Sequence, residues 1–237
     1  MKRRRLGQHY LVDPEVVRRI VGFAQIAPME RVLEIGTGRG ALTREAAGLG
    51  SSFVGYELDP RNHEETSKAV RGTRARIYLA DAFKQSPAFD VLVSSLPYSE
   101  SVRFIEWLAG IEFKRAIVVL QVDFVRKVLA PPGDREYRGV SALSQIAFDV
   151  RVLEHLERKA FSPQPRVDSV VVSIVPRRVL PRAEISNVMR LFSLRRRQTR
   201  SALGNLGIES KKDYGLRRVY ELGPDEVHEL CDPSAPP

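Results

Sequence analysis

The chain has 237 residues, of which 43% are hydrophobic and 28% charged, and this is typical of a folded protein with one large domain or one large and one small domain. Its 38 Lys and Arg residues exceed its 29 Asp and Glu residues, and the net charge of +9 favours a polyanionic partner such as nucleic acid. The single cysteine excludes an intrachain disulfide framework and fits a reducing compartment, so we expect a cytoplasmic protein. No apolar run reaches the 18 residues of a membrane span.

Along the chain, Asp13-Pro14 is typical of a helix N-cap followed by proline at the first helical position, and helical spacing of apolar residues extends to about Gln25. Strands and helices then alternate from Arg31. The predicted strands are 31–35, 52–56, 75–79, 90–94 and 116–121, and the predicted helices are 41–48, 61–70, 100–109 and 124–130. This alternation predicts an α/β fold with an open, mostly parallel sheet, in which ligands bind beyond the C-terminal ends of the strands.

The last third of the chain has a different pattern. Two further strands, 146–153 and 169–175, are predicted to form a closing hairpin, and between them lies a loop made rigid by prolines. Alternation stops near Pro176, so we predict a larger domain of residues 1–178 and a small helical domain of residues 179–237. Its first helix is expected to continue through Arg195–Arg200 and to end near Gly204, with short helices near 212–220 and 224–231.

A glycine-rich turn, Gly36-Thr37-Gly38-Arg39-Gly40, follows the 31–35 strand and precedes a helix. Such a turn between a strand and a helix lets the backbone approach a nucleotide closely. Together with Ala41 it also matches the dinucleotide fingerprint, and a third interpretation is a tight turn without a ligand. Glu57, at the end of the next strand, could accept hydrogen bonds from ribose hydroxyls in either nucleotide interpretation. Glu34 would repel a pyrophosphate but suits a cationic group, so it favours a nucleoside that carries an amino acid.

Two other strand ends carry polar signals. Asp81-Ala82 could receive the exocyclic amine of an adenine, or Asp81 could simply cap the next turn. In Ser95-Leu96-Pro97-Tyr98, the Ser95 hydroxyl and the backbone carbonyls on the Pro97 side could accept both hydrogens of a base amine and favour the pyramidal nitrogen that attacks. Tyr98 would stack on the base. The alternative is a strand-ending turn with a core tyrosine.

A basic cluster and the histidines complete the inventory of candidate groups. We expect the cluster to contact phosphate, although a solvated helix face would look the same; it comprises Arg195, Arg196, Arg197 and Arg200. The four histidines lack the spacing of a metal site, and no metal is expected.

Taken in order, these motifs resemble those of a known family. Leu6-Gly7-Gln8-His9-Tyr10-Leu11 resembles its N-terminal motif, and Val32–Gly40 resembles motif I of S-adenosylmethionine-dependent methyltransferases. The motifs at Glu57-Leu58-Asp59, Asp81-Ala82, Ser95–Tyr98 and Phe161–Ser169 follow in family order. As a set, over about residues 3–203, they resemble the ribosomal RNA adenine dimethyltransferases that modify two neighbouring adenines near the 3′ end of small-subunit rRNA.

The resemblance implies a Rossmann-like class I methyltransferase sheet with an antiparallel closing strand and a small all-helical C-terminal domain. It implies S-adenosylmethionine as cofactor, bound at Gln8, His9, Leu11, Glu34, Gly36, Gly38, Glu57, Leu58, Asp81, Ala82 and Ser95. It implies that Ser95, Leu96, Pro97 and Tyr98 hold the target base. The expected partners are small-subunit rRNA and the pre-ribosomal particle in ribosome biogenesis, with the protein a monomer that has no membrane contact.

The sequence departs from the family at Ser95, where the family usually has Asn. Loss of the amide bears on the second methylation, although other amino-methyltransferases use Ser there. Two alternatives to the small-subunit enzyme are a large-subunit rRNA adenine methyltransferase and a non-catalytic RNA- or DNA-binding factor on the same fold. A dehydrogenase is disfavoured because Glu34 and the Ser95–Tyr98 turn would have no role in it.

Overall fold

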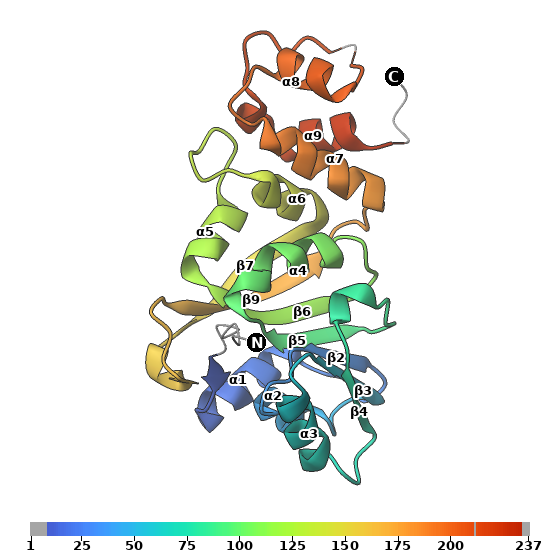
Figure 1. The fold of residues 1–237 in the computed structure, drawn as a ribbon, viewed down its shortest axis with the longest axis vertical. Helices are drawn as coiled ribbons and strands as arrows, with labels where there is room; N and C mark the ends of the chain where they lie inside the picture. Colours follow the sequence, from blue (N-terminus) through green and yellow to red (C-terminus); the bar gives the residue numbers. More distant parts are fainter. Residues whose placement is uncertain (1–8, 211, 234–237) are drawn as a thin grey trace, which may run out of the picture. The chain divides into compact units, whose positions relative to one another are not determined.

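The computed structural model describes residues 9–210 and 212–233, so the expectation for Gln8 lies outside the described residues (Figure 1). Its strands are β1 (Tyr10–Leu11), β2 (Arg31–Ile35), β3 (Ser52–Glu57), β4 (Ala75–Leu79), β5 (Val91–Ser95), β6 (Arg115–Gln121), β7 (Phe148–Leu156), β8 (Phe161–Ser162) and β9 (Ser169–Pro176). Its α-helices are α1 (Pro14–Ala24), α2 (Ala41–Ala46), α3 (Pro60–Ala69), α4 (Ser101–Leu108), α5 (Val122–Leu129), α6 (Gly139–Ala147), α7 (Arg182–Ser193), α8 (Thr199–Leu206) and α9 (Pro224–Cys231).

Seven strands form one sheet in the order β4-β3-β2-β5-β6-β9-β7. Strands β4, β3, β2, β5 and β6 pair in parallel, whereas β9 pairs antiparallel with β6. The mostly parallel sheet with an antiparallel part confirms the predicted fold class. Parallel pairing also places the C-terminal ends of β2, β3, β4 and β5 at one edge of the sheet, where the polar motifs of the sequence end their strands.

The core on one face of the sheet explains why the local pattern folds as it does. Asp13 caps α1 by accepting hydrogen bonds from the N–H groups of Glu15 and Val16, with Pro14 at the first helical position, as predicted. The apolar stripe of α1 and apolar residues of α2 pack in one buried cluster with side chains of β2, β3, β5 and β6. The helices thereby hold the strands whose C-terminal ends carry the motifs.

The chain divides into two compact units. The first comprises residues 1–103, 112–122 and 151–175, and the second comprises residues 104–111, 123–150 and 176–237. The second unit therefore draws on more of the chain than the predicted domain of residues 179–237, and a domain boundary at residue 178 stays a prediction. Beyond β9, the regular elements of the described residues are α7, α8, α9 and a short 3-10 turn, Val219–Glu221, as expected for a helical segment.

Three local predictions were wrong. The strand expected at 146–153 begins later, because residues up to Ala147 belong to α6, in which apolar residues recur at helical spacing among buried serines. The helix expected to continue through Arg195–Arg200 is interrupted after Ser193. The backbone there bonds instead to the 217–220 segment: the Arg195 carbonyl accepts from the N–H of Tyr220 at 3.1 Å. The helix expected over 212–220 is accordingly absent among the described residues.

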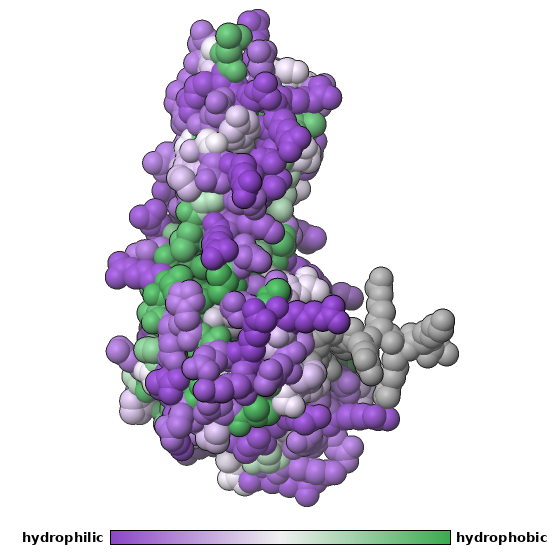
Figure 2. Space-filling view, turned by 90° about the vertical axis from the view of Figure 1, so that its left-hand side faces the viewer, coloured by the Kyte–Doolittle hydropathy of each residue, from purple (hydrophilic) through white to green (hydrophobic). Residues whose placement is uncertain are grey.

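The surface follows the charged composition. On the face drawn in Figure 2, hydrophilic residues predominate, and hydrophobic ones gather mainly in the middle of the view with smaller patches above and below. Within the described part of the chain, no helix combines the length and the apolar character needed to cross a bilayer.

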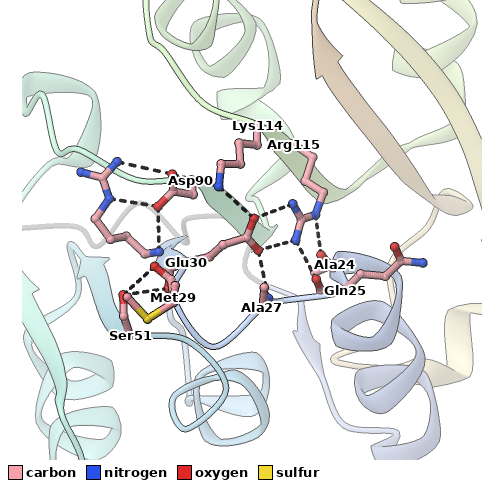
Figure 3. A network of polar contacts seen from close by, with 10 residues as sticks. Ala24, Gln25, Ala27, Met29, Glu30, Ser51, Asp90, Lys114 and Arg115 are labelled. Carbon is pink, nitrogen blue, oxygen red and sulfur yellow. Dashed lines mark hydrogen bonds and ion pairs between the residues drawn. The ribbon is translucent and has the colours of Figure 1, made fainter.

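An ionic network joins the N-terminal ends of three parallel strands, opposite the edge that carries the motifs (Figure 3). Glu30, just before β2, lies within 2.6 Å of an Arg115 guanidinium nitrogen and 3.3 Å of Lys114 Nζ. Asp90, just before β5, accepts from the Arg31 backbone N–H at 2.9 Å and Nε at 3.0 Å. The hydrogen bond from Arg115 is the main cause that lowers the pKa of Glu30 from 4.5 to about 2.

We expect the Glu30→Gln variant to lose about 2–3 kcal/mol of unfolding free energy at pH 7, because one charge of a largely buried pair is removed. The folded-state pKa of Glu30 is depressed, so its contribution is present above about pH 4.5 and is lost as the pH falls toward 2. Urea unfolding from pH 7 to pH 2 should therefore show the difference between wild type and variant shrinking.

Glu64→Gln is the control, because the Glu64 carboxylate pairs with Lys68 on the exposed surface of α3. It should change stability little at any pH. Equal losses from both substitutions would contradict the role assigned to the Glu30 network.

Candidate functional site

The glycine turn after β2 has a backbone that other residues could hardly adopt. Gly36 and Gly38 have φ values of +72° and +53°, in the left-handed region that favours glycine. A Cβ on Gly38 would also lie 3.1 Å from a Tyr10 ring carbon. At Gly36 the nearest atom to such a Cβ is Pro97 Cδ at 3.9 Å. The turn therefore leaves bare backbone facing the open edge of the sheet.

Glu57, at the end of β3, fixes this turn. Its carboxylate accepts hydrogen bonds from the Gly38 N–H at 2.7 Å, the Leu58 N–H at 2.8 Å and the Asp59 N–H at 2.9 Å. A carboxylate offers about four acceptor positions, so three backbone bonds leave one for a ligand hydroxyl. The sequence predicted that Glu57 is an acceptor for a ligand. It did not predict that Glu57 also joins the ends of two neighbouring strands through these hydrogen bonds.

The N-terminal motif is brought to the turn by a contact between segments far apart in the sequence. Strand β1 pairs antiparallel with β8, so that Leu11 lies opposite Phe161. His9 Nδ1 lies 2.7 Å from the Pro163 carbonyl oxygen. The Tyr10 ring lies beside Gly38 and under the Arg39 guanidinium, 4.6 Å from the ring centroid.

The Ser95–Tyr98 turn lies at the end of β5. Tyr98 Oη and Ser169 Oγ are 2.7 Å apart, and the Tyr98 ring stacks on His9 with centroids 5.6 Å apart. Burial raises the pKa of Tyr98, so the hydroxyl stays protonated. The Ser95 hydroxyl forms no hydrogen bond with any residue that the structure describes, which leaves it available to a ligand.

Glu34, in β2, is the buried acid that the sequence predicted. Only 1% of the residue is exposed, and Thr43 Oγ1 donates a hydrogen bond to its carboxyl group at 2.5 Å. Burial raises the pKa of Glu34 to about 8, and the charge of Glu57 adds to this rise. A carboxyl group kept from water in this way gains most from a cationic partner.

These motifs line two adjoining cavities at the C-terminal ends of the strands. The first is lined by the predicted residues His9, Leu11, Glu34, Gly36, Gly38, Glu57 and Ser95 to Tyr98. The second is lined by the predicted residues Gly36, Glu57, Leu58, Asp81, Ala82, Leu96 and Pro97. Four positions belong to both cavities, so one extended ligand could span them.

At the second cavity, Asp81 has the capping role that was one of its two interpretations. It accepts from the Phe83 N–H at 3.1 Å and caps a short 3-10 turn. Its other carboxylate oxygen is 2.7 Å from an Arg103 guanidinium nitrogen, and that guanidinium lies 4.7 Å from the centroid of the Phe83 ring. The Arg103 contact was not predicted, since the two residues are 22 positions apart.

Sequence reasoning also missed Thr37 and Phe161 as lining residues of the first cavity. The Thr37 hydroxyl is buried and has no hydrogen-bond partner among the described residues. Its position inside the glycine turn was the available signal, because a polar residue between two glycines of a nucleotide-binding turn faces the ligand or the sheet.

The arginine cluster lies in the second unit. Arg195–Arg197 occupy the turn between α7 and α8, and Arg200 lies in the first turn of α8. None of the four pairs with a carboxylate among the described residues. Burial lowers the pKa of Arg195, and the nearby positive charges of Arg138 and Arg196 lower it further. No group of three or more metal-ligating side chains is found in the part of the chain that the structure describes.

Comparison with known proteins decides the family. The family model for ribosomal RNA adenine dimethylase matches residues 1–227. The chain belongs to the ribosomal RNA adenine dimethylase family. The resemblance seen in the motifs is thereby confirmed, and the chain is assigned to a family of methyltransferases.

Two curated proteins from different organisms are similar to this chain over most of its length. "Probable ribosomal RNA small subunit methyltransferase A" of Thermococcus gammatolerans is 35% identical over 242 residues, which cover 96% of this chain and 87% of that protein. "Probable dimethyladenosine transferase" of Caenorhabditis elegans is 32% identical over 235 residues, which cover 95% of this chain and 73% of that protein.

Two solved structures share the fold of this adenine dimethylase family member. A dimethyladenosine transferase from Plasmodium falciparum has a TM-score of 0.78 at 24% identity, covering 94% of this chain and 96% of that chain. The 23S rRNA methyltransferase ErmE has a TM-score of 0.64 at 24% identity, covering 94% of this chain and 99% of that chain. Both support the class I methyltransferase fold.

The Glu34→Gln variant should be more stable than the wild type at alkaline pH. The folded-state pKa of Glu34 is raised to about 8, so its stabilising contribution is complete below about pH 4.5 and is lost as the pH rises through 8. The advantage of the variant should grow over this interval to roughly 5 kcal/mol and then level off. Urea unfolding at pH 5, 7 and 9 measures it, and a constant difference at all three would show that Glu34 does not titrate as described.

Proposed function

We propose that the two cavities bind S-adenosylmethionine and that the protein transfers its methyl groups to the exocyclic amines of two adjacent adenines near the 3′ end of small-subunit rRNA. The observation that carries this proposal is that Ser95–Tyr98 line the same cavity as the glycine turn and Glu34. A donor site for a cationic nucleoside and an acceptor site for a base amine are thus adjacent. The names of the curated relatives support the small subunit as the partner.

The residues present are suited to this cofactor. The buried Thr37 hydroxyl without a partner and the protected Glu34 carboxyl face the first cavity, where a cationic amino-acid moiety would satisfy them. His9 and Leu11 would contact that moiety, Gly36 would lie beneath it, and Glu57 would accept from the ribose with its remaining acceptor position. Asp81 and Ala82 in the second cavity would hold the adenine.

When bound, S-adenosylmethionine supplies a methyl group on a sulfonium, which a nucleophile can attack in line. The chain contributes positioning and electrostatics. The Ser95 hydroxyl and the carbonyls on the Pro97 side accept the hydrogens of the target amine, which directs the nitrogen lone pair toward the methyl group. Tyr98, fixed by Ser169 and His9, offers the face turned away from His9 for stacking. The adenine must be unpaired or flipped to reach this turn.

The decisive experiment is methyl transfer from labelled S-adenosylmethionine to purified small or large ribosomal subunits that lack the modification. We expect label in small subunits alone, recovered by mass spectrometry as dimethyladenosine at adjacent positions. Transfer to large subunits would favour the alternative substrate. Folded protein that binds S-adenosylmethionine but transfers nothing would favour a non-catalytic RNA-binding role.

The Ser95→Asn variant tests the departure from the family. An amide oxygen reaches farther than a hydroxyl and can keep one hydrogen bond to the amine after the first methyl is added. We expect the second methylation to become about fivefold faster, the equivalent of one hydrogen bond of about 1 kcal/mol. The ratio of dimethylated to monomethylated adenine at early times measures this. Ser94→Asn is unsuitable as a control because Ser94 Oγ donates to the Ile35 carbonyl. Ser86→Asn, at an exposed position that lines neither cavity, should leave the ratio unchanged.

A further inference from the structure

The strand at one end of the sheet, β4, presents an unusual surface for an edge strand. Ala75 and Ile77 pack against the core cluster beneath the sheet. The alternate positions Arg74, Arg76 and Tyr78 are exposed, and Tyr78 is 43% exposed. Because side chains alternate along a strand, Arg76 and Tyr78 lie on the face of the sheet away from that cluster, and Arg74 lies in the bend just before the strand.

Strand β3 adds a second aromatic ring to this face. Tyr56 lies opposite Tyr78 in the parallel register, and the two rings stack with centroids 5.6 Å apart and planes inclined by 28°. Tyr56 also lines the second cavity. The surface formed by Tyr56, Arg74, Arg76 and Tyr78, called the β4 platform below, therefore begins at the rim of the candidate cofactor site.

The charge of the β4 platform is uncompensated. Neither Arg74 nor Arg76 forms an ion pair with a carboxylate among the described residues, whereas Arg31 and Arg115, which begin β2 and β6, are paired. One role of charged residues on an edge strand is to prevent aggregation through that edge, without any ligand. That role would account for the arginines, but it gives no reason for a stacked tyrosine pair left open to water.

We propose that the β4 platform binds a single-stranded segment of the RNA that carries the target adenine, with a base stacked on Tyr78 and phosphates on Arg74 and Arg76. Aromatic rings on a sheet face beside unpaired arginines provide the chemistry that recognises unpaired bases, because stacking needs splayed bases and arginine binds phosphate. The proposal rests on the proposed RNA substrate and adds a contact outside the cofactor cavities.

The test is binding of a fluorescein-labelled single-stranded RNA, copied from the 3′ end of small-subunit rRNA, to the full chain by fluorescence anisotropy. Tyr78→Ala should weaken binding about tenfold, from the loss of one stacked base, and Tyr78→Phe should bind like the wild type. The double variant Arg74→Ala, Arg76→Ala should weaken binding and reduce the slope of log affinity against log salt by about 1.4, the value for two phosphate contacts on a single strand.

Lys68→Ala is the control for a change of charge outside the β4 platform, since Lys68 is exposed on α3 and pairs with Glu64. The proposal would be overturned if Tyr78→Ala, the double variant and Lys68→Ala all bound the single-stranded RNA with equal affinity. A fully paired duplex of the same sequence should show no dependence on Tyr78, and an equal dependence would also overturn it. Because the arginines are exposed, the double variant remains informative if Tyr78→Ala fails to fold.

Methyl transfer and S-adenosylmethionine binding by the wild type, measured in parallel, separate this proposal from the function it rests on. If the wild type methylates small subunits while the platform variants bind RNA normally, the β4 platform fails and the enzyme remains. If the wild type transfers no methyl group but the variants lose RNA binding, the proposed enzymatic function fails and the β4 platform stands as an RNA-binding surface.

Discussion

The hydrogen bonds that Glu57 accepts from three backbone N–H groups are the constraint on which the candidate site depends. They join the end of β3 to the glycine turn after β2, and so fix two of the strand ends that meet at this edge of the sheet. A turn with left-handed glycines has many conformations available in an unfolded chain. A single carboxylate selects one of them and keeps an acceptor position for a ligand, so the group that shapes the turn is also the one proposed to contact the ligand.

Two buried acids near the ends of β2 have pKa values shifted in opposite directions. Glu30 precedes the strand and is compensated by Arg115 and Lys114, and its hydrogen bond with Arg115 lowers its pKa to about 2. Glu34 lies inside the strand with a hydroxyl partner only, and its burial raises its pKa to about 8. The uncompensated acid costs stability until a cation arrives, as expected where function and stability compete. The network at one end of the strands helps to offset that cost at the other.

Much of the sheet could be predicted from the sequence, because apolar runs such as Ala116–Leu120 and glycine turns are local signals. The motifs were placed at strand ends for the same reason, and parallel pairing then brought them together. The failures arose where tertiary contacts override local pattern. Ile146 and Ala147 were predicted to begin a strand but end α6, and Arg195 and Arg197 leave the helix because their carbonyls accept from a segment more than twenty residues later.

The same distinction separates the two halves of the candidate site. The donor half, from Glu34 to Gly38 with Glu57, is built within 24 residues of chain, and its geometry follows from one strand–turn–helix unit and the next strand. The acceptor half is built from three distant segments: His9 is held by Pro163, and Tyr98 by His9 and Ser169. Local geometry suffices to bind a cofactor shared by many methyltransferases. Selection of one base requires a pocket whose walls can vary independently of that geometry, and long-range contacts supply such walls.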